Sequence, residues 1–199
     1  MNLVERAKNI LLTPNKEWDV IKGESLSITD MFTKYAMILA AIPAVAGFIG
    51  NSVIGISYGF GTFRVPLGSS LVWAILQYVL SLGGVYLFAF IIDALAPSFG
   101  CTKDLTASMK VVVFSYTAAW VAGILMIIPS LAILVSLASI YSLYLLYIGL
   151  AKVKSVPKDK MVGYYVVSIV VAVVIFFVIG LIVSRVAFGG AYAALRGGF

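Results

Sequence analysis

The stretch between Lys110 and Lys152 constrains this chain most, because it contains no charged residue. One helix crosses the hydrocarbon core of a bilayer with about 20 apolar residues at a rise of about 1.5 Å each. The stretch is therefore long enough for two crossings. Pro129 and Ser130 lie near its middle, where a turn would divide it. These features predict a helical hairpin within a membrane, with lysines at both of its ends.

The composition excludes a water-soluble fold. Of the 199 residues, 62% are hydrophobic and 11% are charged, whereas soluble domains contain about 25% charged residues. The chain has no histidine and one cysteine, Cys101, so it lacks the usual general base near neutral pH and any internal disulfide. The absence of histidine also argues against a zinc or iron site. We therefore expect no metal, no cofactor and no enzymatic activity.

The apolar runs predict an all-α polytopic membrane protein with five transmembrane helices. Residues 1–30 form a short amphipathic segment, residues 31–186 form the membrane domain, and residues 187–199 form a glycine-rich tail. Each run is long enough for one crossing. The predicted spans are approximately 35–54, 71–95, 111–128, 131–151 and 161–183.

The positions of the basic residues predict the orientation of these spans, since lysine and arginine concentrate in cytosolic loops. Eleven of them fall on the side of the N-terminus and three on the opposite side. We therefore expect a cytosolic N-terminus and an external C-terminus. This orientation explains the net charge of +6 without nucleic acid as a partner. The basic loop KVKSVPKDK is a candidate contact for anionic lipid headgroups.

Residues 1–30 contain two short amphipathic patterns, of the kind that lie in the headgroup region. Thr13 and Pro14 predict the start of the second helix, as N-cap and first helical residue. We select Pro14, Glu17 and Trp18 as candidate functional residues. The structural alternative places Trp18 in the membrane interface or in the cytosolic mouth of the bundle.

Asp93 is the only acidic residue inside an apolar run. A carboxylate within a span often marks a path for ions or protons. Asp93 lies about one turn before Pro97, however, near the cytosolic end of the second predicted span. There it could pair with Lys103 or Lys110, or remain hydrated. We favour this structural interpretation, because the cost of a charge depends on its depth in the membrane.

Two further groups of residues in the spans are candidates for packing or function. Tyr116, with its neighbours Ser115 and Thr117, places three hydroxyls in the first half of the third span. Small residues four apart allow helix backbones to approach closely, within one chain or between two copies. We favour packing within one chain. The small residues are Ala118, Ala119, Ala122 and Gly123 in the third span, and Ala46 and Gly50 in the first.

Several segments resemble prokaryotic Yip1-domain proteins. They are LLTPNKEWDVIKGE, AIPAVAGFIG and SFGCTKDLTASMKVVVFSYTAAWVAGILMIIPSL, the last of which includes Pro129 before the fourth span. The resemblance implies five membrane helices, in a prokaryotic cell membrane. Eukaryotic members bind Rab-type GTPases in membrane traffic and associate with one another, and some prokaryotic members occur beside transporter-like components. The chain departs from the family in its short N-terminal segment and in Gly100-Cys101, where members often have paired glycines.

Two functions follow from these observations. The first is a non-enzymatic scaffold or accessory subunit that organises other membrane proteins or associates with itself. The resemblance, the small-residue helix faces and the missing catalytic groups favour it. The alternative is a small transporter or channel, with Asp93 on the permeation path and the hydroxyls of the third span lining it.

Overall fold

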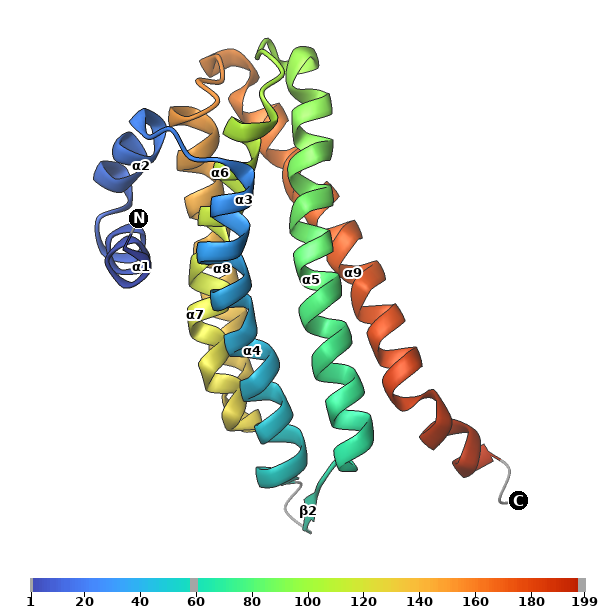
Figure 1. The fold of residues 1–199 in the computed structure, drawn as a ribbon. Coiled ribbons are helices and arrows are strands. Elements are labelled where there is room, and N and C mark those ends of the chain that lie inside the picture. The colour runs from blue at the N-terminus through green and yellow to red at the C-terminus, as the bar shows by residue number, and fades with distance from the viewer. Residues whose placement is uncertain (1, 58–60, 197–199) are drawn as a thin grey trace.

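The computed structural model describes residues 2–57 and 61–196, with side chains described as far as Ala187. The chain is almost entirely helical (Figure 1). Its first helices are α1 (Leu3–Leu12), α2 (Pro14–Gly23), α3 (Ile28–Met31) and α4 (Met37–Ile49). The strands β1 (Ile56–Ser57) and β2 (Thr62–Phe63) follow. The remaining helices are α5 (Leu67–Leu95), α6 (Leu105–Ser115), α7 (Thr117–Ala122), α8 (Ala132–Lys152) and α9 (Lys158–Arg196).

Short π- and 3-10 segments join several of these helices into five rods. The segments are Phe32–Ala36, Gly50–Ile54, Ala96–Phe99, Gly123–Ile127 and Pro129–Leu131. The rods are long and apolar enough to span a membrane, and they cover Ile28–Ile54, Leu67–Phe99, Leu105–Ile127, Pro129–Lys152 and Lys158–Ala187. The predicted all-α fold with five spans is confirmed. Each rod is longer than, or about as long as, its predicted span, because helices continue into the headgroup region beyond the hydrocarbon core.

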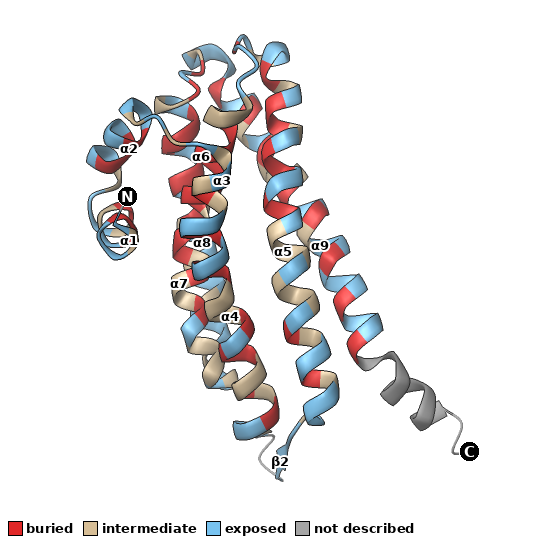
Figure 2. Ribbon diagram, viewed as in Figure 1, coloured by how far each residue is buried: buried red, intermediate tan, exposed pale blue. Residues whose placement is uncertain are grey.

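The third rod is the central helix of the bundle. In its most apolar window 56% of the residues are buried, against 22–33% in the other four rods. It packs against α4, α5 and α8, whereas α9 lies outermost and packs mainly on α5 (Figure 1). Buried residues are densest in the upper half of Figure 2. The four outer helices therefore present most of their apolar side chains to lipid.

The two ends of the bundle differ in charge. We call the upper end in Figure 1 the lysine-rich end: there α3, α6 and α9 begin, and α5 and α8 end. Its lysines are Lys22, Lys103, Lys110, Lys152, Lys154, Lys158 and Lys160. The opposite end carries the antiparallel strands, with Ile56 paired to Phe63, and we call it the β1–β2 end. Gly55 ends the first rod with a φ of 85°, a conformation that favours glycine.

Small residues bring the first and third rods into close contact. A Cβ added to Gly123 would lie 2.6 Å from the ring of Pro43, and one added to Gly50 would collide with the carbonyl of Met126. Ala46 and Ala118 are also buried. In this structure the small-residue faces of these two rods therefore pack within one chain.

The predicted tail begins inside a helix. Residues 187–196 continue α9 without a break, and residues 197–199 lie outside the described part of the chain. The sequence AYAALR near the end of α9 is rich in alanine, the strongest helix former. The glycines before it are too few to end the helix.

Candidate functional site

The N-terminal helix pair, α1 and α2, folds back onto the flank of the bundle beside α7 and α8 (Figure 1). Trp18 and Ile21 point inward from α2 and are completely buried. The indole of Trp18 meets the edge of Phe114 at a centroid distance of 6.4 Å. On its other side it lies over Gly149, where an added Cβ would approach the ring to 2.8 Å. Because Gly149 has no side chain, it leaves the space that the Trp18 ring occupies.

Arg6 holds the helix pair together from within. One guanidinium nitrogen lies 2.5 Å from a carboxylate oxygen of Glu17, and the other lies 2.5 Å from Glu24. The guanidinium carbon also lies 5.7 Å from the centre of the Phe114 ring, on the bundle. Arg6 is buried, and two carboxylates and an aromatic face replace the hydration of its terminal nitrogens, whereas its Nε has no hydrogen-bond partner among the described residues. This network fixes the angle between α1 and α2.

Two lysines on helices of the bundle form hydrogen bonds to α2. Lys110, on α6, donates hydrogen bonds to the backbone carbonyls of Ile21 at 3.0 Å and Glu24 at 2.5 Å. These carbonyls lie at the C-terminal end of α2, where free acceptors and the helix dipole attract a cation. Lys152, on α8, donates to the carbonyl of Asn15 at 2.7 Å and to the carboxylate of Asp19 at 2.6 Å. Positive charges of the bundle thus dock α2.

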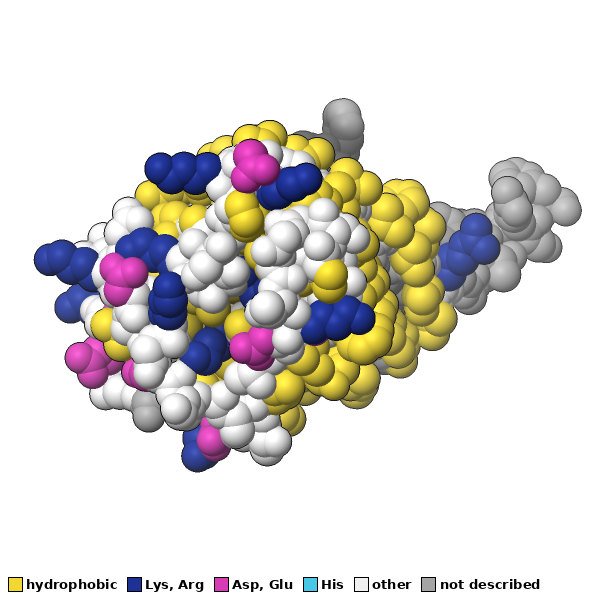
Figure 3. Space-filling view, turned by 90° about the horizontal axis from the view of Figure 1, so that it is seen from above, with side chains coloured by type: hydrophobic (Ala, Val, Ile, Leu, Met, Phe, Trp, Pro, Cys, Tyr) yellow, Lys and Arg dark blue, Asp and Glu magenta, His cyan; other side chains and the backbone are white. Residues whose placement is uncertain are grey.

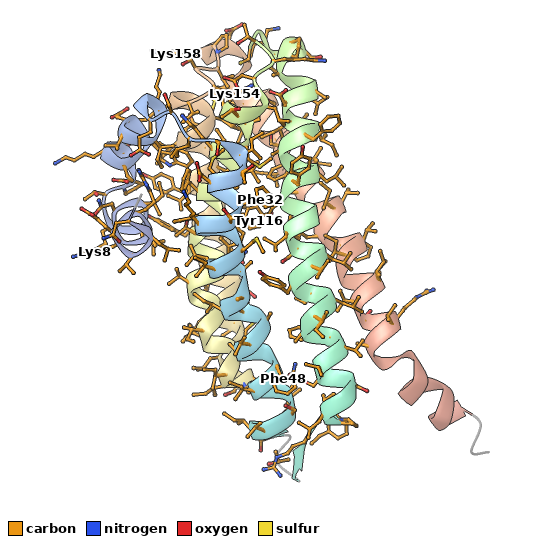
Figure 4. The ribbon with its side chains drawn as sticks, viewed as in Figure 1. Lys8, Phe32, Phe48, Tyr116, Lys154 and Lys158 are labelled. Carbon is orange, nitrogen blue, oxygen red and sulfur yellow. The ribbon has the colours of Figure 1, made fainter. Side chains whose placement is uncertain are left out.

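Asp93 lies in a second cluster at the same end. Its Oδ1 accepts hydrogen bonds from Lys154 Nζ at 3.0 Å, from the Ser108 hydroxyl at 2.8 Å and from the Asp104 amide at 2.8 Å. Lys154 also donates to the carbonyl of Thr102 at 3.0 Å. Both charged side chains are largely buried. The cluster therefore ties the end of α5, the start of α6 and the α8–α9 loop to one point (Figure 4).

Aromatic and sulfur side chains surround this ion pair. The Tyr164 hydroxyl donates to the carbonyl of Ile92, next to Asp93, and its ring stacks on Phe99 at 4.7 Å. Cys101 lies in the loop before α6 and is buried. Burial raises the pKa of the Cys101 thiol, and the positive charge of Lys154 opposes that shift. The ion pair is thus shielded by apolar groups in addition to its hydrogen bonds.

The expected partner of Asp93 was wrong. Sequence reasoning paired it with Lys103 or Lys110, or left it hydrated, but its partner is Lys154. Lys110 is directed instead at the end of α2. The α8–α9 loop folds back over the end of α5, and sequence distance alone gives no indication of this return. The structural interpretation of Asp93 agrees with the three donors that its Oδ1 accepts from.

The other predicted residues separate into different regions. Glu17 and Trp18 join the docked helix pair, and Pro14 begins α2 as its first residue. Tyr116 lies further down the bundle (Figure 4), in an aromatic cluster with Phe88 and Phe176. Pro129 is remote from all of them, in the turn between the third and fourth rods. The candidate residues therefore do not form one site.

Sequence reasoning missed the cations that organise this end. From the sequence, Arg6 is only a topology signal, Lys110 is a possible partner of Asp93, and Lys152 and Lys154 are possible lipid contacts. A signal was available for Lys110, because α6 continues without a break from Lys110 into a wholly apolar run. A buried lysine needs acceptors. Such acceptors come from chain segments too distant for a sequence pattern to indicate.

Basic and acidic side chains at the lysine-rich end pair with one another. Seen from above, basic and acidic side chains lie interspersed around a mixed surface (Figure 3). Among residues 2–57 and 61–187, no three histidine, cysteine or carboxylate side chains lie close enough to hold a metal ion. The buried carboxylates Glu17 and Asp93 each have a cationic partner. The arrangement is suited to holding helices in place.

Five apolar rods with a docked amphipathic helix pair define a multi-pass integral membrane protein. The Yip1 domain model matches residues 8–182, and the chain belongs to the Yip1 domain family. The chain is also similar to the inner membrane protein YohC of Escherichia coli strain K12, with 28% identity over 117 residues. YohC of E. coli O6:H1 matches to the same extent.

The similarity to both relatives is partial. It covers 58% of this chain and 60% of the length of each relative. No solved structure matches this chain.

Proposed function

We propose that this protein is a non-enzymatic scaffold or accessory subunit that organises other membrane proteins, with its lysine-rich end in the cytosol. Support comes chiefly from the docked helix pair. The inner face of the pair is fixed to the bundle through Trp18, Arg6, Lys110 and Lys152. Its outer face is consequently presented in a constant orientation, as a binding surface requires.

The outer face of α1 has the composition of a contact surface. Val4 and Leu12 are 71% and 69% exposed, and Lys8 lies between them on the same face. A spacing of four residues aligns these side chains along one side of a helix. We call this row, Val4, Lys8 and Leu12, the α1 stripe. Its apolar residues fit an apolar partner, and its lysine fits an acidic one.

Lipid headgroups are a secondary partner in this proposal. Of the four lysines in the loop KVKSVPKDK, Lys152 and Lys154 are engaged within the protein. Lys158 and Lys160 remain exposed. These two are available to attract anionic lipid, each contributing about 1 kcal/mol near a charged surface. The loop is thus a weaker lipid contact than its sequence suggests.

The contacts of Asp93 favour a role in assembly over a role in permeation. Asp93 is bound to Lys154 and to two further donors at one end of the bundle. A group on a permeation path has to exchange its partners during transport, and breaking this buried pair would be costly. A flux assay in liposomes tests the alternative directly. Wild-type flux that is lost on Asp93→Asn would favour transport.

Site-specific photocrosslinking in native membranes tests the scaffold role. A photoreactive amino acid replaces Leu12 in the α1 stripe, and a matched variant carries it at Val173, which is 62% exposed on the outer face of α9. We expect Leu12 to give a discrete protein adduct, recoverable in mild detergent as a partner or a second copy. Val173 should give mainly lipid adducts. Lipid adducts alone at both positions, from a chain that stays monomeric, would contradict the proposal.

A further inference from the structure

A groove runs between α4 and α5 in the half of the bundle nearest the β1–β2 end. Its volume is about 300 Å³, at the lower limit of ligand sites. Ala44 and Ala74 are buried and form the floor, while Val45 and Ile75 are more than half exposed and form the rims. Alanines on both helices leave this space open. The lining residues are Ala41, Ala44, Val45, Phe48, Leu71, Ala74, Ile75 and Tyr78.

Both ends of the groove are defined. At the inner end, the Tyr78 hydroxyl donates to the carbonyl of Met37 at 3.2 Å and closes the gap between the helices. At the other end lies the loop that connects α4 to α5. Arg64 extends from this loop and donates from Nε to the carbonyl of Val53 at 2.8 Å. The groove is therefore apolar along its length and basic at its mouth.

Arg64 has no acidic partner in the described part of the chain. It is the only charged residue between Lys34 and Asp93. Its side chain is exposed, and none of the salt bridges among the described residues includes it. Arginine presents a planar fork of donors that matches the oxygens of a phosphate. Near the surface of a bilayer, the phosphate of a phospholipid is the closest available anion.

We propose that this groove binds one acyl chain of a phospholipid from the leaflet adjoining the β1–β2 end, with Arg64 contacting its phosphate. Residues 41–48 extend about 10 Å along α4, and Val53 lies about 8 Å beyond Phe48. The distance of about 8 Å between Phe48 and Val53 leaves room for the glycerol ester that links the acyl chain to the phosphate. A narrow, wholly apolar groove with one basic residue at its mouth suits a single acyl chain below a phosphate.

The expected preference is moderate. An acyl chain is already in an apolar medium before it enters the groove, so the hydrophobic effect does not drive its binding. Close packing against the alanine floor and the charged contact at Arg64 provide the preference. A lipid held in this way should exchange more slowly than the lipid around α9, without being permanently bound.

Native mass spectrometry of the full chain, released from membranes in mild detergent, tests the charged contact. We expect one retained phospholipid per chain. Arg64→Gln should lower its occupancy about fivefold, equivalent to about 1 kcal/mol. Arg185→Gln is the matched control, because Arg185 is exposed on α9, and it should leave occupancy unchanged. Equal occupancy in wild type and Arg64→Gln would overturn the role of Arg64.

The same measurement tests the groove itself. Ala74→Leu places three additional carbon atoms on the floor and should lower phospholipid occupancy by a similar factor. Ala132→Leu makes the same change at an exposed position of α8 and serves as its control. Equal retention by Ala74→Leu and wild type would show that lipid does not enter the groove.

Photolabelling of the wild-type chain does not depend on how the variants fold. The chain is placed in phosphatidylglycerol nanodiscs that contain a trace of the same lipid with a photoreactive acyl chain. Labelled peptides should be enriched in residues 41–48 and 71–78 over residues 170–182 of α9. Uniform labelling of all lipid-facing helices would refute the proposal.

Discussion

The ion pair between Asp93 and Lys154 joins residues that are 61 positions apart in the sequence. Removing one member of a buried pair leaves the other charge without compensation and typically costs 3–5 kcal/mol. Asp93→Asn should therefore lower the thermal midpoint clearly. Lys154→Met should lower it less, because Ser108 and the Asp104 amide still bind Asp93. The double variant should recover much of the loss.

Cys101 provides the measurement for this prediction, because it is the only cysteine and is buried. A dye that fluoresces on reaction with thiols reports the exposure of Cys101 as detergent-solubilised protein is heated. Lys34→Met is the control, since its pair with Asp30 lies on the surface and contributes little. A midpoint for Asp93→Asn that equals the wild-type value would show that the pair does not stabilise this end.

The thiol of Cys101 should also react slowly in the folded protein. Burial raises its pKa, so the reactive thiolate is scarcer than in a free cysteine, whose pKa is about 8.5. The maleimide labelling rate should rise at higher pH than for a model thiol. Because the folded pKa exceeds the unfolded one, this group should lose stabilisation as pH rises above about 8.5. Labelling kinetics identical to those of a free thiol would contradict the burial of Cys101.

At the scale of elements, α2 is held on α8 by the fit between Trp18 and Gly149. Gly149→Ala would place a Cβ 2.8 Å from the indole, so the ring or the helix has to move. We expect α2 to loosen and trypsin to cleave after Lys16 and Lys22 several-fold faster in native membranes. Gly180→Ala is the matched control, because an added Cβ there meets nothing within 4 Å.

Removing the indole of Trp18 tests the same contact between Trp18 and Gly149. Trp18→Ala removes a fully buried side chain, a change that costs about 3–5 kcal/mol in protein cores. Cleavage should therefore be faster than in Gly149→Ala. Unchanged cleavage in both variants would mean that α2 is held mainly by Lys110 and Lys152. Combining either variant with Lys152→Met would then reveal that contribution.

At the scale of the whole molecule, the odd number of rods predicts that the first rod begins on one side of the membrane and α9 ends on the other. The lysine-rich end should lie in the cytosol, following the distribution of basic residues. Fluorescent protein inserted in the α8–α9 loop should therefore be fluorescent. Alkaline phosphatase fused after residue 196 should be active, because that enzyme requires export. Activity of the phosphatase in the α8–α9 loop would invert this orientation.

The membrane class, the five spans and the approximate position of each turn could be predicted from the amino-acid sequence. These features depend on local hydrophobicity, since a helix that crosses lipid satisfies its backbone hydrogen bonds internally. The sequence also indicated the start of α2 at Thr13-Pro14. The uncharged stretch from Lys110 to Lys152 was correctly divided at Pro129.

Which charges meet, and where the groove lies, depends on how the five rods pack in the folded protein. Lys154 reaches Asp93, and Lys110 reaches the end of α2, through contacts between segments that are distant in the sequence. The groove exists because Ala44 and Ala74 face each other across two helices. Hydrophobic pattern specifies that a helix is buried or lipid-facing, but not which neighbour it meets. That choice depends on the combined shapes and charges of all five rods.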